Sequence, residues 1–163
     1  MINYELAEEY KEGTIKDLLV RSYAELLEFD PEHWEPEKKK WVAFDAAIYA
    51  NPDTVGQCVF VMLNDWKIIG FASYDPRQKP VAIIGHNCIL PEFRGKGFGA
   101  MQMNELLEKV KKLGFKKAEV TTNENPFFEP AKKMYLKCGF FLSDMIIGGP
   151  EGKYKMIKLV KDL

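Results

Sequence analysis

The chain has 163 residues, of which 47% are hydrophobic and 29% are charged, and its net charge is −1. This length suits one domain with a sizeable core, so we expect a single domain over residues 1–163. The small net charge does not favour nucleic acid or an anionic membrane as a partner. No apolar run approaches the roughly 20 residues of a membrane span. Residues 1–5 lack the basic and apolar regions of a signal peptide, which predicts a cytoplasmic protein.

Cysteine and histidine are too sparse to indicate a metal site. The three cysteines, Cys58, Cys88 and Cys138, lie on apolar segments without metal-ligand spacing, and we expect buried thiols in a reducing compartment. The two histidines, His33 and His86, are far apart in the sequence. We therefore expect no metal cofactor.

The first part of the chain predicts one strand and two helices. Weak alternation marks a short strand within residues 2–10. Thr14 is the predicted N-cap of the first helix, with Asp17 at capping-box distance from it. Two prolines within residues 29–36 end that helix, and a second helix is expected over residues 37–50.

Most of the remaining chain predicts strands. A hairpin joins the predicted strands 57–63 and 67–74, and residues 81–89 form the next strand. The later elements are expected in the order helix, strand, helix, strand and strand, over residues 101–113, 116–122, 130–137, 140–147 and 154–160, the last two flanking a Gly-rich turn at 148–152. The resulting order, β-α-α-β-β-β-α-β-α-β-β, predicts an α/β (α+β) fold, a mixed sheet with helices on both faces.

Residues Ile89–Met101 lie between a predicted strand and a predicted helix, and we name them the cradle. Pro91 ends the strand, and three glycines alternate with Lys96 and Phe98 before the helix. Backbone N–H groups at a helix start favour an anion, and glycines let a phosphate approach the backbone closely. Arg94 and Lys96 add positive charge. The cradle therefore predicts a pyrophosphate site, and an ordinary strand–helix turn with solvated cations is the alternative.

Two other phosphate-binding loops do not fit the cradle. A P-loop ends in Gly-Lys-Ser/Thr, and no lysine here is followed by Ser or Thr at that spacing. The dinucleotide fingerprint is Gly-x-Gly-x-x-Gly, whereas Gly95, Gly97 and Gly99 are spaced Gly-x-Gly-x-Gly. The pattern that fits is Arg/Gln-x-x-Gly-x-Gly/Ala, met by Arg94, Gly97 and Gly99 after Ile89-Leu90-Pro91-Glu92.

This pattern closely resembles the coenzyme-A-binding signature of the GNAT acyl-CoA N-acyltransferase family. A second segment, Ala131 to Phe140, resembles the family's Ala-x-x-x-Tyr-x-x-x-Gly-Phe segment, whose tyrosine lies near the coenzyme sulfur and is Tyr135 here. The element order is also similar to the GNAT fold, which implies a mostly antiparallel sheet of about six or seven strands.

The resemblance implies an N-acetyltransferase that uses acetyl-CoA and a primary amine of a small molecule or peptide. Backbone groups of Cys88–Leu90 would hold the pantetheine arm and supply an oxyanion donor. The acyl chain, the identity of the amine and a homodimer stay open. The implied coenzyme-binding residues are Cys88, Ile89, Leu90, Arg94, Gly95, Lys96, Gly97, Phe98, Gly99, Ala100, Ala131 and Tyr135.

Tyr135 is the predicted general acid. When an amine attacks a thioester, the coenzyme leaves as a thiolate, whose conjugate thiol has a pKa of about 8.5. A tyrosine hydroxyl can donate a proton to this thiolate. A half-buried core tyrosine is the alternative. Many family members place an asparagine seven residues earlier, where this sequence has Phe128, so the coenzyme contacts of that asparagine are not carried over.

His86 is the predicted general base, because imidazole titrates in the useful range and His86 lies on the strand before the cradle. A packed histidine is the alternative, and Glu119 on the next strand is the other candidate base. The first two helices and the loop after Tyr74 are expected to bind the acceptor. The predicted substrate-binding residues are Asp30, Trp34, Phe44 and Tyr74.

Two rival functions stay open. One is a coenzyme-A-binding sensor or scaffold without turnover, and the presence of Tyr135 favours the enzyme over it. The other is a nucleotide-binding domain that uses the cradle for a different phosphate ligand. The missing P-loop lysine–hydroxyl pair argues against that domain.

Overall fold

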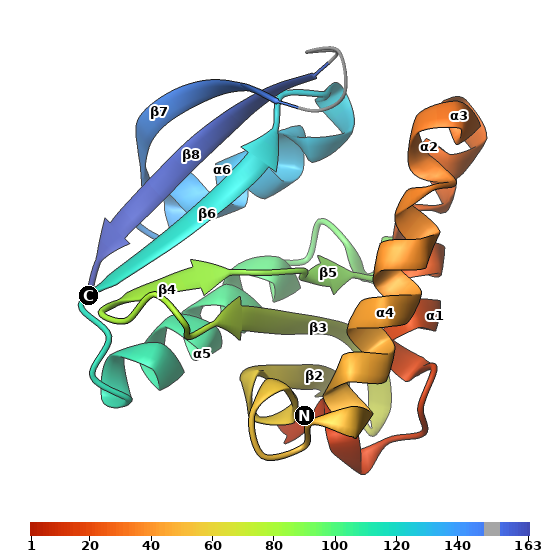
Figure 1. The fold of residues 1–163 in the computed structure, drawn as a ribbon, viewed down its shortest axis with the longest axis vertical. Helices are drawn as coiled ribbons and strands as arrows, with labels where there is room; N and C mark the ends of the chain where they lie inside the picture. The colour runs from red at the N-terminus through yellow and green to blue at the C-terminus, as the bar shows by residue number, and fades with distance from the viewer. Residues whose placement is uncertain (149–153) are drawn as a thin grey trace. The chain divides into compact units, whose positions relative to one another are not determined.

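A computed structural model describes residues 1–148 and 154–163 of the chain (Figure 1). The Gly-rich turn predicted at 148–152 lies largely outside these residues. The chain forms two compact units, each assembled from distant segments: residues 1–73 with 86–98, and residues 74–85 with 99–163. The single domain expected over residues 1–163 stays a prediction.

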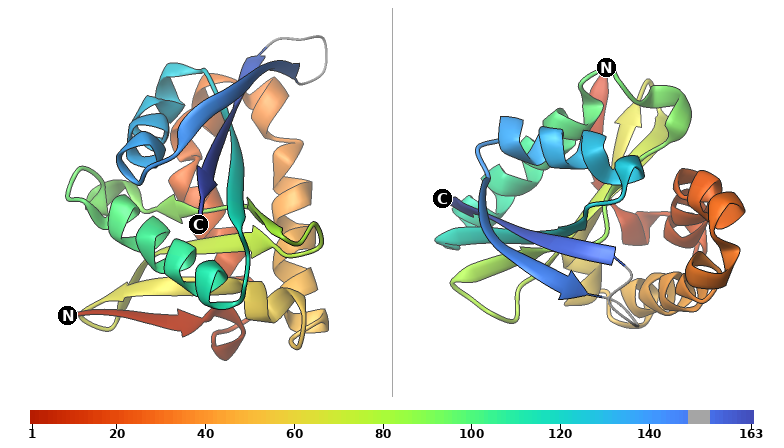
Figure 2. Two further views of the ribbon diagram at one scale, coloured as in Figure 1. Left: turned by 90° about the vertical axis from the view of Figure 1, so that its left-hand side faces the viewer. Right: turned by 90° about the horizontal axis from the view of Figure 1, so that it is seen from above.

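The first unit combines four strands with four α-helices. Neighbouring strands pair antiparallel in the order β1-β2-β3, and β5 pairs with β3. Helices α1 and α4 lie side by side (Figures 1 and 2). The elements are β1 (Ile2–Leu6), α1 (Thr14–Ser22), α2 (Ala24–Phe29), α3 (Pro31–Trp34), α4 (Glu37–Ala50), β2 (Val59–Asn64), β3 (Lys67–Asp75) and β5 (Cys88–Ile89), with 3₁₀ turns at Ala7–Glu9, Val55–Cys58 and Pro91–Phe93.

In its described residues, 74–85, 99–148 and 154–163, the second unit contains the remaining strands and two α-helices. Strand β4 pairs antiparallel with the last two residues of β3 and parallel with β6, and β8 pairs antiparallel with both β6 and β7. The elements are β4 (Val81–Ile84), α5 (Phe98–Lys112), β6 (Lys117–Asn123), α6 (Glu129–Lys137), β7 (Phe141–Gly148) and β8 (Tyr154–Asp162), with a 3₁₀ turn at Pro126–Phe128.

The hydrogen-bonded strand order, β1-β2-β3-β4-β6-β8-β7, confirms the predicted mixed α/β class and the mostly antiparallel sheet. The sheet has eight strands because the strand predicted at 81–89 is two strands, β4 and β5. Between the pairs Phe71–Cys88 and Tyr74–Ile84, two residues of β3 lie opposite three residues, 85–87. This extra residue interrupts the ladder as a β-bulge does.

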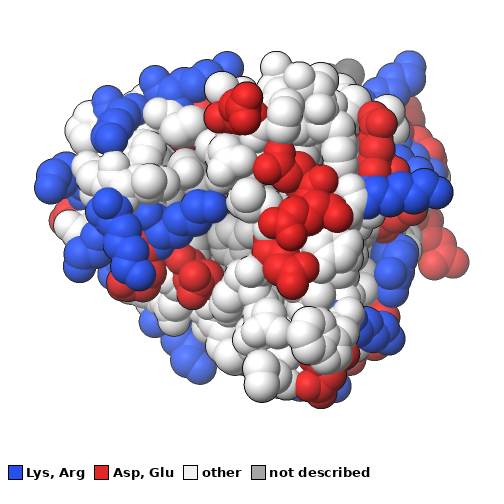
Figure 3. All heavy atoms as spheres, turned by 90° about the horizontal axis from the view of Figure 1, so that it is seen from below, with Lys and Arg blue, Asp and Glu red and all other residues white. Residues whose placement is uncertain are grey.

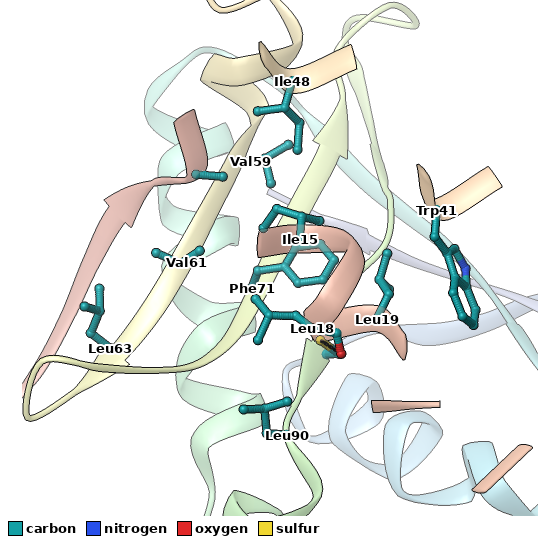
Figure 4. Close-up of a cluster of buried hydrophobic side chains, with 12 residues drawn as sticks. Ile15, Leu18, Leu19, Trp41, Ile48, Val59, Val61, Leu63, Phe71 and Leu90 are labelled. Carbon is teal, nitrogen blue, oxygen red and sulfur yellow. Dashed lines mark hydrogen bonds between the residues drawn. The ribbon is translucent and has the colours of Figure 1, made fainter. Parts of the chain in front are cut away.

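A buried apolar cluster holds the first unit together (Figure 4). Side chains of α1 and α4, among them Ile15, Leu19 and Ile48, are fully buried with residues of the strands such as Phe71. Burying one such side chain contributes about 1.5–3 kcal/mol, so these contacts fix α1 and α4 on the strands. Within the described residues, no helix has the length and apolar character that crossing a membrane requires.

The start of α1 differs from the sequence prediction. The N-cap is Gly13 rather than Thr14, and glycine has no side chain that could accept from the first N–H groups of the helix. The carboxylate of Asp45, on α4, accepts hydrogen bonds from the N–H of Gly13 at 2.8 Å and of Lys16 at 3.0 Å. Asp45 is 3% exposed, so a buried carboxylate satisfies the helix start and complements its dipole.

We therefore expect Asp45→Asn to destabilise the protein, because an amide nitrogen would replace one accepting oxygen opposite a backbone N–H. The expected loss in unfolding free energy is about 1–2 kcal/mol, measured by urea unfolding. Asp17→Asn is the matched control, since Asp17 is exposed on α1 and pairs with Lys16, and its effect should stay within about 0.5 kcal/mol. Equal losses in the two variants would contradict the role of Asp45.

Candidate functional site

The cradle turns from β5 into α5 through two glycines with left-handed backbone. Gly95 has φ +73° and Gly97 has φ +85°, values that favour glycine over residues with a side chain. A Cβ atom placed on either glycine would have no atom within 4 Å. The backbone of the turn is therefore open to a ligand at Gly95 and Gly97.

Helix α5 begins at Phe98, three residues earlier than predicted, so Gly99 and Ala100 lie in its first turn. The first N–H groups of a helix have no intrahelical partner and carry the positive end of its dipole. The first turn of α5 contains no acidic residue, whereas its last turn contains three lysines. No carboxylate in the first turn balances the positive end of the α5 dipole. An anion bound at this helix start would balance it.

The two cations of the cradle both contact backbone carbonyls. Lys96 Nζ donates to the carbonyl of Glu92 at 3.3 Å and lies 5.6 Å from the ring centroid of Phe93. The guanidinium of Arg94 donates from Nε to the carbonyl of Ile89 at 2.9 Å and from Nη2 to the carbonyl of Ser22 at 2.7 Å. Arg94 therefore stabilises the conformation of the turn and also adds positive charge to it.

Strand β5 offers main-chain groups on one edge. The N–H of Leu90 donates to the carbonyl of Ile69, on β3, at 2.8 Å. Successive N–H groups of an antiparallel strand alternate in direction, so the N–H and C=O of Ile89 point away from β3. The Ile89 carbonyl accepts from Arg94, in agreement with this direction. Backbone groups of Cys88, Ile89 and Leu90 were predicted to bind the coenzyme. Of these three residues, Ile89 is the one whose N–H does not donate to β3.

His86 is the middle one of the three residues between β4 and β5. Its carbonyl accepts from the hydroxyl of Ser73 at 2.7 Å, and the ring of Phe44 lies 5.1 Å from its imidazole. Burial lowers the pKa of His86 below its ordinary value, while the charges of Glu37 and Lys40 on α4 act in opposite directions by smaller amounts. The imidazole is therefore neutral at pH 7, as a proton acceptor must be.

The thiol of Cys88 is not set up to act as a nucleophile. It is buried in the core cluster, with Sγ 4.0 Å from the carbonyl of Leu18. Burial raises the pKa of Cys88 to about 11, which keeps the thiol protonated at neutral pH. A covalent mechanism through Cys88 is therefore disfavoured.

Three of the predicted acceptor residues lie in the first unit. Trp34 stacks on Tyr23 with ring centroids 6.3 Å apart, and Tyr23 stacks on Trp41 at 5.4 Å. Asp30 is the N-cap of α3, where its carboxylate accepts from the N–H of His33. Phe44 lies beside the imidazole of His86, as described above. Asp30 thus lies between α2 and α3, Trp34 lies on α3 and Phe44 lies on α4.

In the second unit, Tyr135 is 4% exposed and packs edge-on against Phe140 at 5.5 Å. Tyr74 is also buried and packs against Phe115, which favours a core role over substrate contact. Phe128 is the residue before α6. Glu119, the other candidate base, forms an ion pair with Lys158 at 3.1 Å.

The loop between β6 and α6 is held by two asparagine side chains. Asn123 accepts from the N–H of Asn125 at 2.7 Å, and Asn125 accepts from the N–H of Phe127 at 2.9 Å. These local bonds fix the loop that carries Phe127 and Phe128, whose rings pack edge-on.

The predicted site residues are distributed over the two units. The first unit contains His86, Asp30, Trp34, Phe44 and the coenzyme residues from Cys88 to Phe98. The second unit contains Tyr74, Gly99, Ala100, Ala131 and Tyr135. Three structural partners had no signal in the sequence. The side chains of Asp45 and Ser73 bond to backbone atoms of distant segments, and the carbonyl of Ser22 accepts from the side chain of Arg94. No group of three potential metal ligands is found among the described residues.

Comparison with known proteins gives a consistent family. A family model described as acetyltransferase (GNAT) family matches residues 13–140. No curated protein sequence matches the chain significantly. Among solved structures, the IAA acetyltransferase from Bacillus cereus aligns over 100% of both chains with 18% identity and a TM-score of 0.70.

Two further solved structures are similar. The proposed acetyltransferase yncA of Salmonella typhimurium, solved with its cofactor acetyl-CoA, aligns over 99% of this chain and 93% of its own, with 14% identity and a TM-score of 0.73. The ribosomal-protein-S18-alanine N-acetyltransferase from Escherichia coli aligns over 99% and 94%, with 12% identity and a TM-score of 0.67. At these sequence identities, the similarity shows a shared fold and nothing about the substrate.

The lowered pKa of His86 predicts a specific loss of stability in acid. The pKa of a histidine in the unfolded chain is about 6.5, and the pKa of His86 in the folded protein is lower. The unfolded state therefore gains protons first, and stability falls as the pH drops from about 6.5 through the folded pKa. We expect the stability difference between pH 7.5 and pH 5 to shrink in His86→Gln.

Urea unfolding of both proteins across this pH range tests the expectation. Between pH 7.5 and pH 9 the imidazole is neutral in both states, so the two proteins should show parallel pH dependence there. An unchanged acid slope in His86→Gln would mean that His86 is solvated in the folded protein.

Proposed function

Because the chain belongs to the GNAT acetyltransferase family, we propose that it transfers an acetyl group from acetyl-CoA to a primary amine of a small molecule or peptide, by direct attack in a ternary complex. The observation that carries this proposal is the open, left-handed turn at Gly95 and Gly97, followed by a helix start without an acidic residue. The chain is accordingly an acyltransferase.

The residues present fit coenzyme A at this turn. N–H groups from Gly97 to Ala100 would receive the pyrophosphate, with Lys96 beside them, because the start of α5 lacks a local carboxylate. The carbonyl of Ile89, on the outward edge of β5, would accept from an amide N–H of the pantetheine arm. When bound, the coenzyme supplies the acetyl group as an activated thioester.

Three groups of the chain would then act on the acceptor and the thioester. Neutral His86 accepts the proton that the ammonium form of the amine must lose before attack. The N–H of Ile89 donates to the acetyl oxygen as negative charge develops there. The hydroxyl of Tyr135 donates to the departing thiolate.

The setting that fits this proposal is cytoplasmic, with an amine substrate as the partner and with neither nucleic acid nor membrane. The face drawn in Figure 3 carries both basic and acidic side chains, and the net charge of the chain is −1. A homodimer is compatible with the proposal. The acceptor is to be found by an assay of thiol release across small amines, aminoglycosides, polyamines and peptide N-termini.

A matched pair of variants at Gly97 tests the coenzyme site. Both Gly97→Asn and Gly97→Asp place a side chain of one size on the same left-handed backbone, so both meet similar strain. Only aspartate adds a negative charge where the pyrophosphate is proposed to bind. We expect coenzyme A affinity, measured by calorimetry, to fall at least about tenfold further in Gly97→Asp than in Gly97→Asn.

Circular dichroism provides the control that both variants are folded. Equal affinities in two folded variants would end the proposal that an anion binds at Gly97.

Tyr135→Phe separates an enzyme from a coenzyme-binding sensor. The ring would still pack against Phe140, so stability should change little, while an interaction proposed for the transition state is lost. General acid assistance is worth about 10²–10⁴-fold, so turnover should fall more than tenfold with little change in coenzyme affinity.

Turnover and coenzyme affinity are measured on the same folded preparation, with an amine identified by the thiol-release assay. Retention of more than about half of the turnover would assign Tyr135 to packing alone. A wild-type protein that binds coenzyme A yet acetylates no amine in the screen would favour the sensor.

A further inference from the structure

We propose that Arg94 is a positioning residue, which ties the end of α1 to the cradle so that coenzyme binding orders the acceptor side of the first unit. This inference rests on the proposed function, and it assigns Arg94 a role in addition to attraction of the pyrophosphate. The acceptor side is defined here as residues 23–34, which include the predicted substrate residues Asp30 and Trp34.

The contacts of Arg94 have the geometry of a brace. Nε donates to the carbonyl of Ile89, at the end of β5, and Nη2 donates to the carbonyl of Ser22, the last residue of α1. Ser22 is 1% exposed, so its carbonyl has little access to water as an alternative partner. Carbonyls at a helix end lack intrahelical partners and carry its negative dipole, which favours a cation there.

The chemistry of the side chain matters as well as its charge. A guanidinium holds several donors in one rigid plane, so it can bond two carbonyls in fixed directions at once. A lysine in place of Arg94 would keep the charge but offers a single flexible ammonium. Substitution by lysine therefore separates the brace from the attraction of an anion.

Two neighbouring contacts join the same segments. Arg21, on α1, forms an ion pair with Glu92 of the cradle at 3.1 Å. This pair is exposed and contributes little by itself. Beneath it, Leu18 of α1 and Cys88 of β5 are buried in one apolar cluster. Packing brings α1 and β5 together, and Arg94 fixes how the end of the helix meets the turn.

The brace continues directly into the acceptor side. The residue after Ser22 is Tyr23, where the backbone leaves helical geometry between α1 and α2. Its ring lies between those of Trp34 and Trp41 in the aromatic stack. The covalent and hydrogen-bonded path thus runs from the cradle through Arg94 and Ser22 to Tyr23 and Trp34. A pyrophosphate that immobilises the turn would reduce motion along this path.

Hydrogen exchange of backbone amides in residues 20–34 tests the proposal, with wild type, Arg94→Lys, Arg94→Met and the control Arg77→Gln. Arg77 is an exposed arginine paired with Asp75, so its loss removes an arginine without touching the brace. Without coenzyme, both Arg94 variants should exchange about tenfold faster than wild type in this segment, as expected for loss of a charge-assisted hydrogen bond, and Arg77→Gln should not.

With saturating coenzyme A, wild type should gain protection in residues 20–34. At a coenzyme A concentration that saturates each variant by calorimetry, Arg94→Lys should lose most of that added protection, because its ammonium cannot hold the two carbonyls in fixed directions. Added protection retained in Arg94→Lys would overturn the inference, as would wild type that binds coenzyme A without protecting the segment. Wild type that does not bind coenzyme A would instead reject the proposed function, and this inference with it.

Discussion

Backbone N–H and C=O groups at helix ends need hydrogen-bond partners, and in this chain side chains from distant segments supply several of them. Asp45 accepts from the N–H groups at the start of α1, and Arg94 donates to a carbonyl at its end. Lys79 donates to the carbonyl of Leu113, just after α5, at 2.9 Å. The first turn of α5 differs, because no acidic residue lies in it. The proposed coenzyme site thus occupies a helix end that the sequence leaves without negative charge.

Much of the fold could be predicted from sequence because its signals are local. Apolar periodicity, paired prolines and turn residues located the hairpin, the long helices and the later strands along the chain. The start of α1 could not be predicted, because Gly13 is satisfied by a carboxylate 32 positions later in the sequence. The break between β4 and β5 had a signal, since Gly85 lies inside the predicted strand 81–89, directly after the apolar residues 81–84. The first predicted helix is interrupted at Tyr23, whose ring packs with those of Trp34 and Trp41 from later segments.

The proposed site was predictable to the extent that it depends on backbone conformation. The glycine spacing of the cradle led to the turn at Gly95 and Gly97, because left-handed φ angles restrict which residues fit. The environment of His86 was not predictable, since the lowered pKa comes from burial beside Phe44, which is distant in the sequence. The second contact of Arg94 escaped prediction for a related reason. Its acceptor is the main-chain carbonyl of Ser22, and any residue type carries such a carbonyl.

The proposed recognition through main-chain groups is consistent with a fold that is kept at low sequence identity. The three solved structures described above share 12–18% identity with this chain at TM-scores of 0.67–0.73. A turn that binds through N–H groups constrains φ and ψ at a few glycines and leaves the side chains around it free to change. Recognition of the acceptor has the opposite requirement, because the residues proposed for it, such as Trp34 and Phe44, would act through their side chains. Divergence should therefore concentrate in α2, α3 and α4, while the backbone from β5 into α5 stays constant.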